Sequence, residues 1–298
     1  MKHRLVAVSL FLLAGASAVA AAPTAVVEGV QMPAWVERGG SREPLAPGME
    51  LRPADRITTG ANSRLLLRLA EGSQVKLGEN AQLSLERLAQ TREDRQTLLS
   101  AALDVARGAF RFTTDARARL TSRRAVDIRV ATVTAGIRGT DLWGKSAADR
   151  DIVCLIEGRI AVQREGGEPV SMDQALQFYI APKANGRPDA SRPVQLATVT
   201  SEQLAQWAAE TEIAAGQGAA RRGGRWKLIA AEAAEQGQAL AVYDKLRAEG
   251  YAATIFPTGS AEKRVYQVRL TGLASKAEAE ALGARIEAIA GGRGRAAL

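Results

Sequence analysis

The sequence predicts a multidomain chain, with an all-β domain followed by a small α+β domain. From Val26 to Ile180, short apolar segments with a period of two residues alternate with turns rich in Gly, Pro and Asn. After Gly224, strand-like segments alternate with two helical patterns instead. We expect a signal peptide over 1–20, the all-β domain over 27–195, a helix and Gly/Arg-rich linker over 196–224, and the α+β domain over 225–298.

The N-terminus has the pattern of a cleaved secretory signal. Lys2, His3 and Arg4 precede an apolar run that ends near Ala16, and Ala18-Val19-Ala20 follows. The run is shorter than the roughly 20 residues that span a membrane, and no later segment is long and apolar enough to do so. The mature chain is therefore predicted to be exported and soluble.

Composition excludes several kinds of chemistry. His3 is the only histidine and leaves with the signal, which excludes Ser-His-Asp and Cys-His catalysis and any His-ligated metal site. Cys154 is the only cysteine, so no intrachain disulfide can form, and its apolar neighbours predict a buried strand residue. We expect no catalytic residue, metal site or cofactor, and hence a protein that is not an enzyme.

The charge points to an anionic partner. The full chain has 40 Lys+Arg against 32 Asp+Glu, a net charge of +8, which falls to +6 without residues 1–20. Residues 221–298 carry +5 of it. Export argues against nucleic acid, so a cell-wall or membrane surface suits the charge better.

Several segments of the β domain alternate apolar and polar residues and should face a core. They carry Leu65, Leu67, Leu69, Val75, Leu77, Leu83, Leu85, Val126, Ile128 and Val130. Residues 89–98 are polar and predict an exposed loop, 175–180 a last strand, and 182–193 the exit from the domain. A sandwich, a barrel or a short β-solenoid would each fit this pattern.

The stretch after Val130 predicts a tight structural turn. Gly136 and Gly139 allow backbone conformations that other residues avoid, and Arg138 and Asp141 are close enough to brace the turn. Leu142 and Trp143 would anchor it in the core.

Between the domains, Thr200 to Gln203 form a capping box that predicts a helix to about residue 215. Leu204 and Trp207 would pack on the β domain. Residues 216–224, rich in Gly and Arg, predict a flexible basic linker.

The last segment has the order β-α-β-β-α of a ferredoxin-like fold. We expect strands over 225–231, 253–256 and 265–270, helices over 238–249 and from 276, and a weak last strand over 293–298. Ser275 and Glu278 form the capping box of the second helix.

The β domain resembles a known family. The segments GAFRF and VDIRVATVTAGIRGTDLWG, together with the earlier segment LRPADRITTG, are similar to the sequence signature of the FecR domain. The resemblance covers about 27–180. The resemblance implies a domain that binds or organises a ligand or another protein in the cell envelope.

The C-terminal part resembles the SPOR domain, through RWKLIAAEA, QALAVYDKLRAEGYAATIF and RVYQVRLTG. The resemblance implies binding to peptidoglycan glycan strands stripped of their peptides. Ile229 stands where this family often has Gln, and Glu232 lies where it has Gly-Ser.

Four residues are candidates for glycan contact. Trp226 and Tyr266 could stack on sugar rings and Gln267 and Arg269 could make polar contacts, although neighbours on one strand face opposite sides of the sheet. A core position for Trp226 and Tyr266 is an equal alternative.

Together these features predict a periplasmic, non-catalytic envelope protein. It would bind peptidoglycan through the SPOR-like domain, with a possible role at the division site, and present the FecR-like domain to a ligand or another envelope protein. The alternatives are a periplasmic signalling or sensor component of the FecR type and an accessory of a wall-remodelling enzyme.

Overall fold

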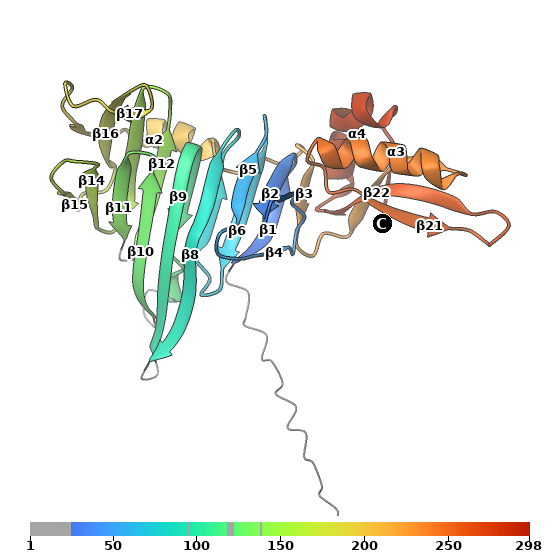
Figure 1. The fold of residues 1–298 in the computed structure, drawn as a ribbon, viewed down its shortest axis with the longest axis horizontal. Helices are drawn as coiled ribbons and strands as arrows, with labels where there is room; N and C mark the ends of the chain where they lie inside the picture. The colour runs from blue at the N-terminus through green and yellow to red at the C-terminus, as the bar shows by residue number, and fades with distance from the viewer. Residues whose placement is uncertain (1–24, 94–95, 118–121, 138) are drawn as a thin grey trace, which may run out of the picture.

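The computed structural model describes residues 25–298 except 94–95, 118–121 and 138. The predicted signal peptide and Arg138 of the predicted turn lie outside these residues. The fold is a two-sheet β-sandwich followed by a smaller α+β unit (Figure 1). Within the described residues, no helix is long and apolar enough to cross a membrane.

The first sheet of the sandwich, sheet A, runs the length of the molecule. Its neighbouring strands are antiparallel. In spatial order they are β1 (Ala25–Gln31), β6 (Arg64–Leu69), β7 (Gln74–Leu77), the end of β9 (Gln96–Thr113), β12 (Asp141–Ser146), β13 (Arg150–Glu157), β16 (Gln177–Ala184) and β18 (Gln195–Thr198), with β4 (Glu50–Leu51) beside the start of β1.

The second sheet, sheet B, packs on the first and contains one parallel pair, β9 with β10. Its order is β3 (Ser41–Pro44), β2 (Ala34–Arg38), β5 (Arg56–Thr59), β8 (Gln82–Glu93), the start of β9, β10 (Ser122–Val130), β11 (Val133–Ile137), β14 (Ile160–Arg164) and β15 (Val170–Met172).

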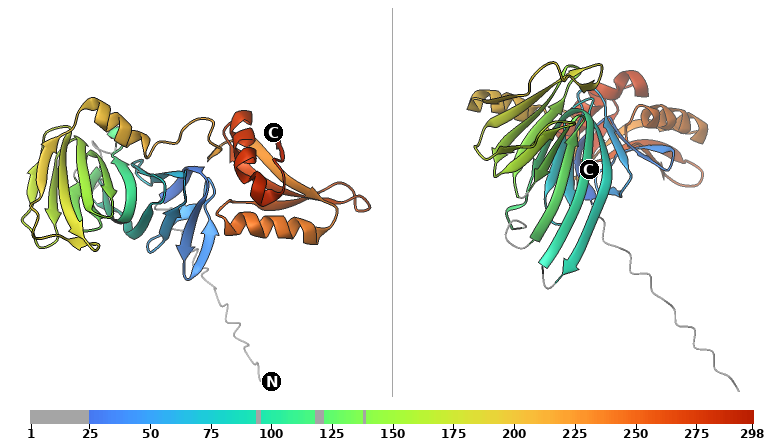
Figure 2. Two further views of the ribbon diagram at one scale, coloured as in Figure 1. Left: turned by 90° about the horizontal axis from the view of Figure 1, so that it is seen from above. Right: turned by 60° about the vertical axis from the view of Figure 1, so that its left-hand side comes forward.

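The chain alternates between the sheets as it advances along both of them. Of the three arrangements that fit the sequence, the structure is a sandwich (Figure 2). Its chain passes repeatedly from one sheet to the other, as in a solenoid. The predicted core faces of β6, β7, β8 and β10 are all buried between the sheets. Leu142 is buried there too, whereas Trp143 is buried in a separate cluster on the outer face of sheet A.

β9 belongs to both sheets and crosses between them near Gly108. It pairs with β8 and β10 before this residue and with β7 and β12 after it. A Cβ on Gly108 would lie 2.5 Å from Ala81 Cα, so a larger residue does not fit at the crossing. The loop predicted over 89–98 is wrong for most of its length, because β8 and β9 are paired there. Their antiparallel pairing extends from Gln82 with Arg107 to Glu93 with Gln96.

A buried polar cluster ties the two sheets together at one end of the sandwich. The Lys183 ammonium on β16 lies 2.7 Å from Asp151 Oδ1 on β13, and the two side chains are 5% and 0% exposed. Asp151 Oδ2 accepts hydrogen bonds from the backbone N–H (2.9 Å) and hydroxyl (2.6 Å) of Thr132, in the β10–β11 turn of sheet B. Lys183 also donates to Ser146 Oγ at 2.9 Å.

Residues 182–193 do not lead out of the domain. β16 continues to Ala184, a two-residue strand, β17 (Arg187–Pro188), folds back on it, and β18 returns beside β16 as a further strand of sheet A. Four exposed residues form β18, so no buried apolar face marked it in the sequence.

Helix α2 (Ser201–Ala209) covers the outer face of sheet A. The predicted capping box is confirmed, with Thr200 and Gln203 bonded reciprocally. Trp207 stacks on Trp143 with ring centroids 5.0 Å apart, and Phe178 meets Trp207 edge-on. The helix ends earlier than predicted, at Ala209; Thr211 is buried beyond it, and turns and bends follow up to residue 218.

The α+β unit has the predicted order β-α-β-β-α with a short last strand. Its sheet is antiparallel in the order β21-β22-β20-β23. The elements are β20 (Trp226–Ala233), α3 (Gln236–Ala248), β21 (Thr254–Thr258), β22 (Val265–Leu273), α4 (Lys276–Ala290) and β23 (Arg295–Ala297).

The segment predicted as a flexible linker is instead a strand that joins the two units. β19 (Ala219–Arg221) pairs with β1 on one side and with β22 on the other. Its flanking glycines 216, 218 and 223 have φ between +75° and +80°, a backbone conformation that glycine adopts more readily than other residues. The prediction failed because a Gly/Arg-rich composition does not distinguish a flexible linker from a short strand.

One buried carboxylate holds this strand in place. Glu278, in the first turn of α4, accepts the backbone N–H groups of Gly216, Gly218 and Ala219 at 2.7–2.8 Å. Ser275 caps the helix as predicted, by accepting the Glu278 N–H. The second bond of the predicted capping box, from the Ser275 N–H to the Glu278 side chain, is not among the hydrogen bonds of the described residues. The Glu278 carboxylate accepts the N–H groups of Gly216, Gly218 and Ala219 instead.

Gly139, in the turn predicted before Asp141, has φ +80°, whereas Gly136, predicted for the same turn, lies within β11. Asp141 is braced by Arg111, through contacts of 3.0 and 2.7 Å, and by Thr113.

Gly139→Val should therefore lower the free energy of unfolding by about 1 kcal/mol or more, since a β-branched residue is strained at this φ. Gly136→Val is the matched control and should change it by less than about 0.5 kcal/mol, because its Cβ would meet only Asp127 Oδ1, at 3.9 Å. Urea unfolding of both variants measures the difference, and equal stabilities would contradict it.

Candidate functional site

The sheet of the α+β unit has one covered and one open face. Helices α3 and α4 lie on the same side of β21 and β22 (Figure 1). Leu228, Val268 and Leu270 point toward these helices and join the core. Side chains that alternate with them point away from the helices, and this open face is the candidate functional site.

A continuous polar chain crosses all four strands of the open face. The Arg269 guanidinium on β22 lies over the Phe256 ring on β21, 3.9 Å from its centroid. Arg269 donates to Gln267 Oε1, with its Nε at 2.8 Å. Gln267 Nε2 donates to Glu232 Oε1 on β20 at 2.5 Å, and Arg295 Nη2 on β23 donates to the same oxygen at 3.2 Å.

A bulge in β20 brings two residues onto this face. The register pairs Ile229 with Arg269 and Glu232 with Gln267, so Ala230 is the extra residue. Without the bulge, residues three apart in a strand would face opposite sides. Ile229 and Glu232, which depart from the SPOR pattern, therefore both lie on the open face.

The structure separates the four predicted site residues into two groups. Gln267 and Arg269 come together on the open face and hydrogen-bond to each other. Trp226 and Tyr266 are half-buried and pack against the hydrophobic core. The core alternative for these two aromatic residues is therefore the one the structure supports.

Sequence reasoning missed the aromatic residue of the open face. Phe256 is 50% exposed, which is unusual for a side chain of this size. It pairs directly with Gln267 across β21 and β22. Alternation along the strand places Thr254 and Phe256 on one face and Ile255 on the other. Only the strand register shows that Phe256 and Arg269 share a face.

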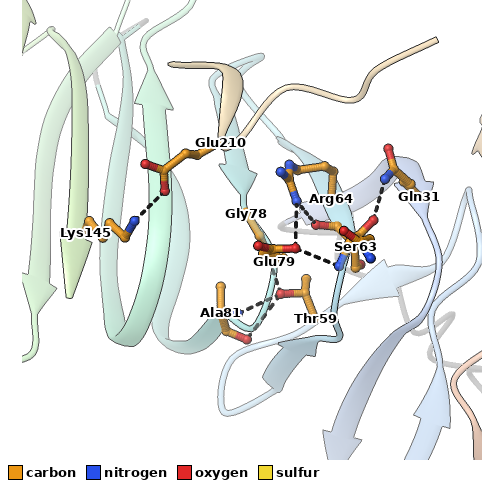
Figure 3. A network of polar contacts seen from close by, with 10 residues as sticks. Gln31, Thr59, Ser63, Arg64, Gly78, Glu79, Ala81, Lys145 and Glu210 are labelled. Carbon is orange, nitrogen blue, oxygen red and sulfur yellow. Dashed lines mark hydrogen bonds and ion pairs between the residues drawn. The ribbon is translucent and has the colours of Figure 1, made fainter. Parts of the chain in front are cut away.

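Two of the hollows on the β-sandwich differ in character. One of about 330 Å³ lies where α2 ends and is lined by Arg64, Glu79, Arg107, Lys145 and Glu210, among others. Among its charged side chains, Lys145 contacts Glu210 at 2.7 Å, and Glu79 accepts the N–H of Asn62 at 2.7 Å (Figure 3). The other, of about 630 Å³, lies on the outer face of sheet B and is lined mainly by β10, β11, β14 and β15.

Neither a metal site nor a reactive thiol emerges from the described residues. No group of three or more His, Cys, Asp or Glu there could hold a metal ion. Cys154 is free and buried as predicted, and burial raises the pKa of its thiol to about 12. A thiol with this pKa is protonated at neutral pH and a poor nucleophile.

Solved structures offer little further guidance. Two crystal structures of a "putative anti-sigma factor" from Parabacteroides distasonis ATCC 8503, at 1.65 and 2.50 Å resolution, are each 13% identical to this chain, with a TM-score of 0.37. The comparison covers 51% of this chain and 64% and 63% of theirs, less than two thirds of their length. No curated protein matches the sequence.

Two protein-family models match the chain. The FecR protein family matches residues 55–161, which lie within the β-sandwich. The SPOR domain family matches residues 222–295, which include all four strands of the open face. The chain thus carries a FecR domain followed by a C-terminal SPOR domain.

Proposed function

We propose that this protein is an exported, non-catalytic component of the cell envelope that binds the glycan strands of peptidoglycan through the open face of its SPOR domain. The observation that carries the proposal is the Phe256–Arg269 pair at the centre of this face. Together with Gln267, this pair offers three groups that suit a glycan strand stripped of its stem peptides: an apolar ring surface, a cation and an amide.

The chemistry of the ligand matches this arrangement. Pyranose rings present apolar C–H surfaces that stack on an aromatic ring such as Phe256. Removal of the stem peptide frees a lactyl carboxylate on each N-acetylmuramic acid, which an arginine can bind. The net charge of +5 over residues 221–298 favours the approach of such an anionic polymer.

The role of the FecR domain in this proposal is to present a surface beside the wall. β19 links sheet A to the SPOR sheet, and Ala34 N–H donates to the Gly250 carbonyl at 3.2 Å. A Cβ on Gly250 would lie 2.5 Å from Trp35, which shows how closely the two units pack. A ligand or envelope protein on the sandwich would thus be held in a fixed orientation to the glycan.

Arg269→Ala in the mature chain should weaken binding to amidase-treated sacculi about tenfold or more, because it removes a cation that would bind the lactyl carboxylate. Co-sedimentation with sacculi, before and after removal of the stem peptides, measures the effect. Wild-type protein should bind the denuded sacculi better.

Lys276→Ala is the control for overall charge. It removes one positive charge from the exposed surface of α4, where Lys276 pairs only weakly with Glu280 at 3.4 Å. Its binding should equal that of the wild type. If the wild-type protein fails to sediment with denuded sacculi, or if both variants bind equally, the open face is not the glycan site.

A further inference from the structure

Two arginines of the open face are already linked, directly or through an amide, to an anion of the chain itself. Glu232 Oε1 accepts one hydrogen bond from Arg295 at 3.2 Å and one from Gln267 at 2.5 Å. Gln267 is in turn bonded to Arg269. A single carboxylate therefore bonds to one arginine directly and is linked to the other through an amide.

This carboxylate is charged but accessible. The hydrogen bonds from Arg295 and Gln267 hold the pKa of Glu232 below its ordinary value, so it is ionised at neutral pH. The side chains of Glu232 and Arg295 are 41% and 57% exposed. Solvent screens an ion pair of this kind, so an external carboxylate can replace Glu232 at little cost.

From this geometry we propose that Glu232 is an internal competitor for the lactyl carboxylate of denuded glycan. It occupies the donor groups of Arg295 and Gln267 that a ligand carboxylate would otherwise use. Binding of such a ligand requires Glu232 to be displaced, whereas a neutral amino sugar can stack on Phe256 without displacing it. Glu232 is thus a specificity-determining residue, and the inference rests on the proposed glycan site.

Glu232→Gln tests the inference in the mature full-length protein. Glutamine keeps the size and an acceptor oxygen but has no charge, so the fold and the hydrogen bond to Gln267 can persist. We expect binding to amidase-treated sacculi to become tighter by about threefold or more. Binding to chitin, whose N-acetylglucosamine units have no carboxylate, should become no tighter.

Two further variants show where the gain comes from. Glu280→Gln makes the same change of charge on the exposed surface of α4, where Glu280 is 60% exposed, and should leave binding to sacculi unchanged. Adding Arg295→Ala to Glu232→Gln should remove the gain, because the freed donor is lost.

The outcomes separate the inference from the proposed function. If wild-type protein binds denuded sacculi through Arg269 but Glu232→Gln binds no better, or if Glu280→Gln gains equally, the competitor role is wrong and the glycan site remains. If neither the wild type nor Glu232→Gln sediments with denuded sacculi, both are wrong. A gain that extends equally to chitin also overturns the competitor role, since no carboxylate is displaced there.

Discussion

Replacing Lys183 with Met is expected to lower the free energy of unfolding by about 3–5 kcal/mol. The substitution keeps the apolar length of the side chain and removes the ammonium group. Asp151, which is fully buried, would then lack its only cation within the described residues. Urea or guanidinium unfolding, followed by far-UV circular dichroism, measures the loss.

Two variants separate this effect from a general loss of charge. Lys145→Met also breaks an ion pair, but Lys145 and Glu210 are 37% and 35% exposed, so its cost should stay below about 1 kcal/mol. Asp151→Asn in the Lys183→Met background should recover part of the stability, because an amide oxygen can still accept from Thr132. Equal losses in Lys183→Met and Lys145→Met would show that the buried pair is not important for stability.

Replacing Glu278 with Ala should cost about 3 kcal/mol or more, since three backbone N–H groups lose their acceptor at once. The N–H groups of Gly218 and Ala219 lie in buried surroundings, and β19 depends on them for its position between the two units. We expect trypsin to cleave Glu278→Ala after Arg221 or Arg222 much faster than the wild type, whose β19 is paired on both sides.

Glu280→Ala provides the comparison for this experiment. It removes a carboxylate from the same helix, two residues away, where the side chain is exposed and contacts Lys276. Its stability should remain within about 0.5 kcal/mol of the wild type, with an unchanged cleavage pattern. Rapid cleavage of the wild type at Arg221 or Arg222 would mean that β19 does not join the units in solution.

The regular parts of the fold could be predicted from the sequence because their signals are local. Alternation at Leu65, Leu67 and Leu69 identifies a core-facing strand, and Thr200 with Gln203 identifies a helix start. The order of strands and helices after Gly224 was also predictable, because both helices have an apolar periodicity, Gly250 follows the first helix and Ser275 caps the second. The boundaries 27–195, 196–224 and 225–298 stay a prediction.

The features that could not be predicted from the sequence depend on long-range contacts. Ala230 carries no sign of a bulge, yet the bulge decides that Glu232 and Gln267 share a face. Glu278 matches a capping box, but its side chain binds a strand about 60 residues earlier. β18 and β19 are short and polar or glycine-flanked, so only their partners define them as strands.

The pairing of β1 with β19 also has a consequence for the order in which the protein can fold. β1 precedes the other described strands in the sequence, and its partner β6 follows soon after. The other edge of β1, at Gly29 to Gln31, lacks its partner until residues 219–221 have been synthesised. Exposed strand edges promote aggregation, so this edge of β1 is open to pairing with another chain until residues 219–221 have been synthesised.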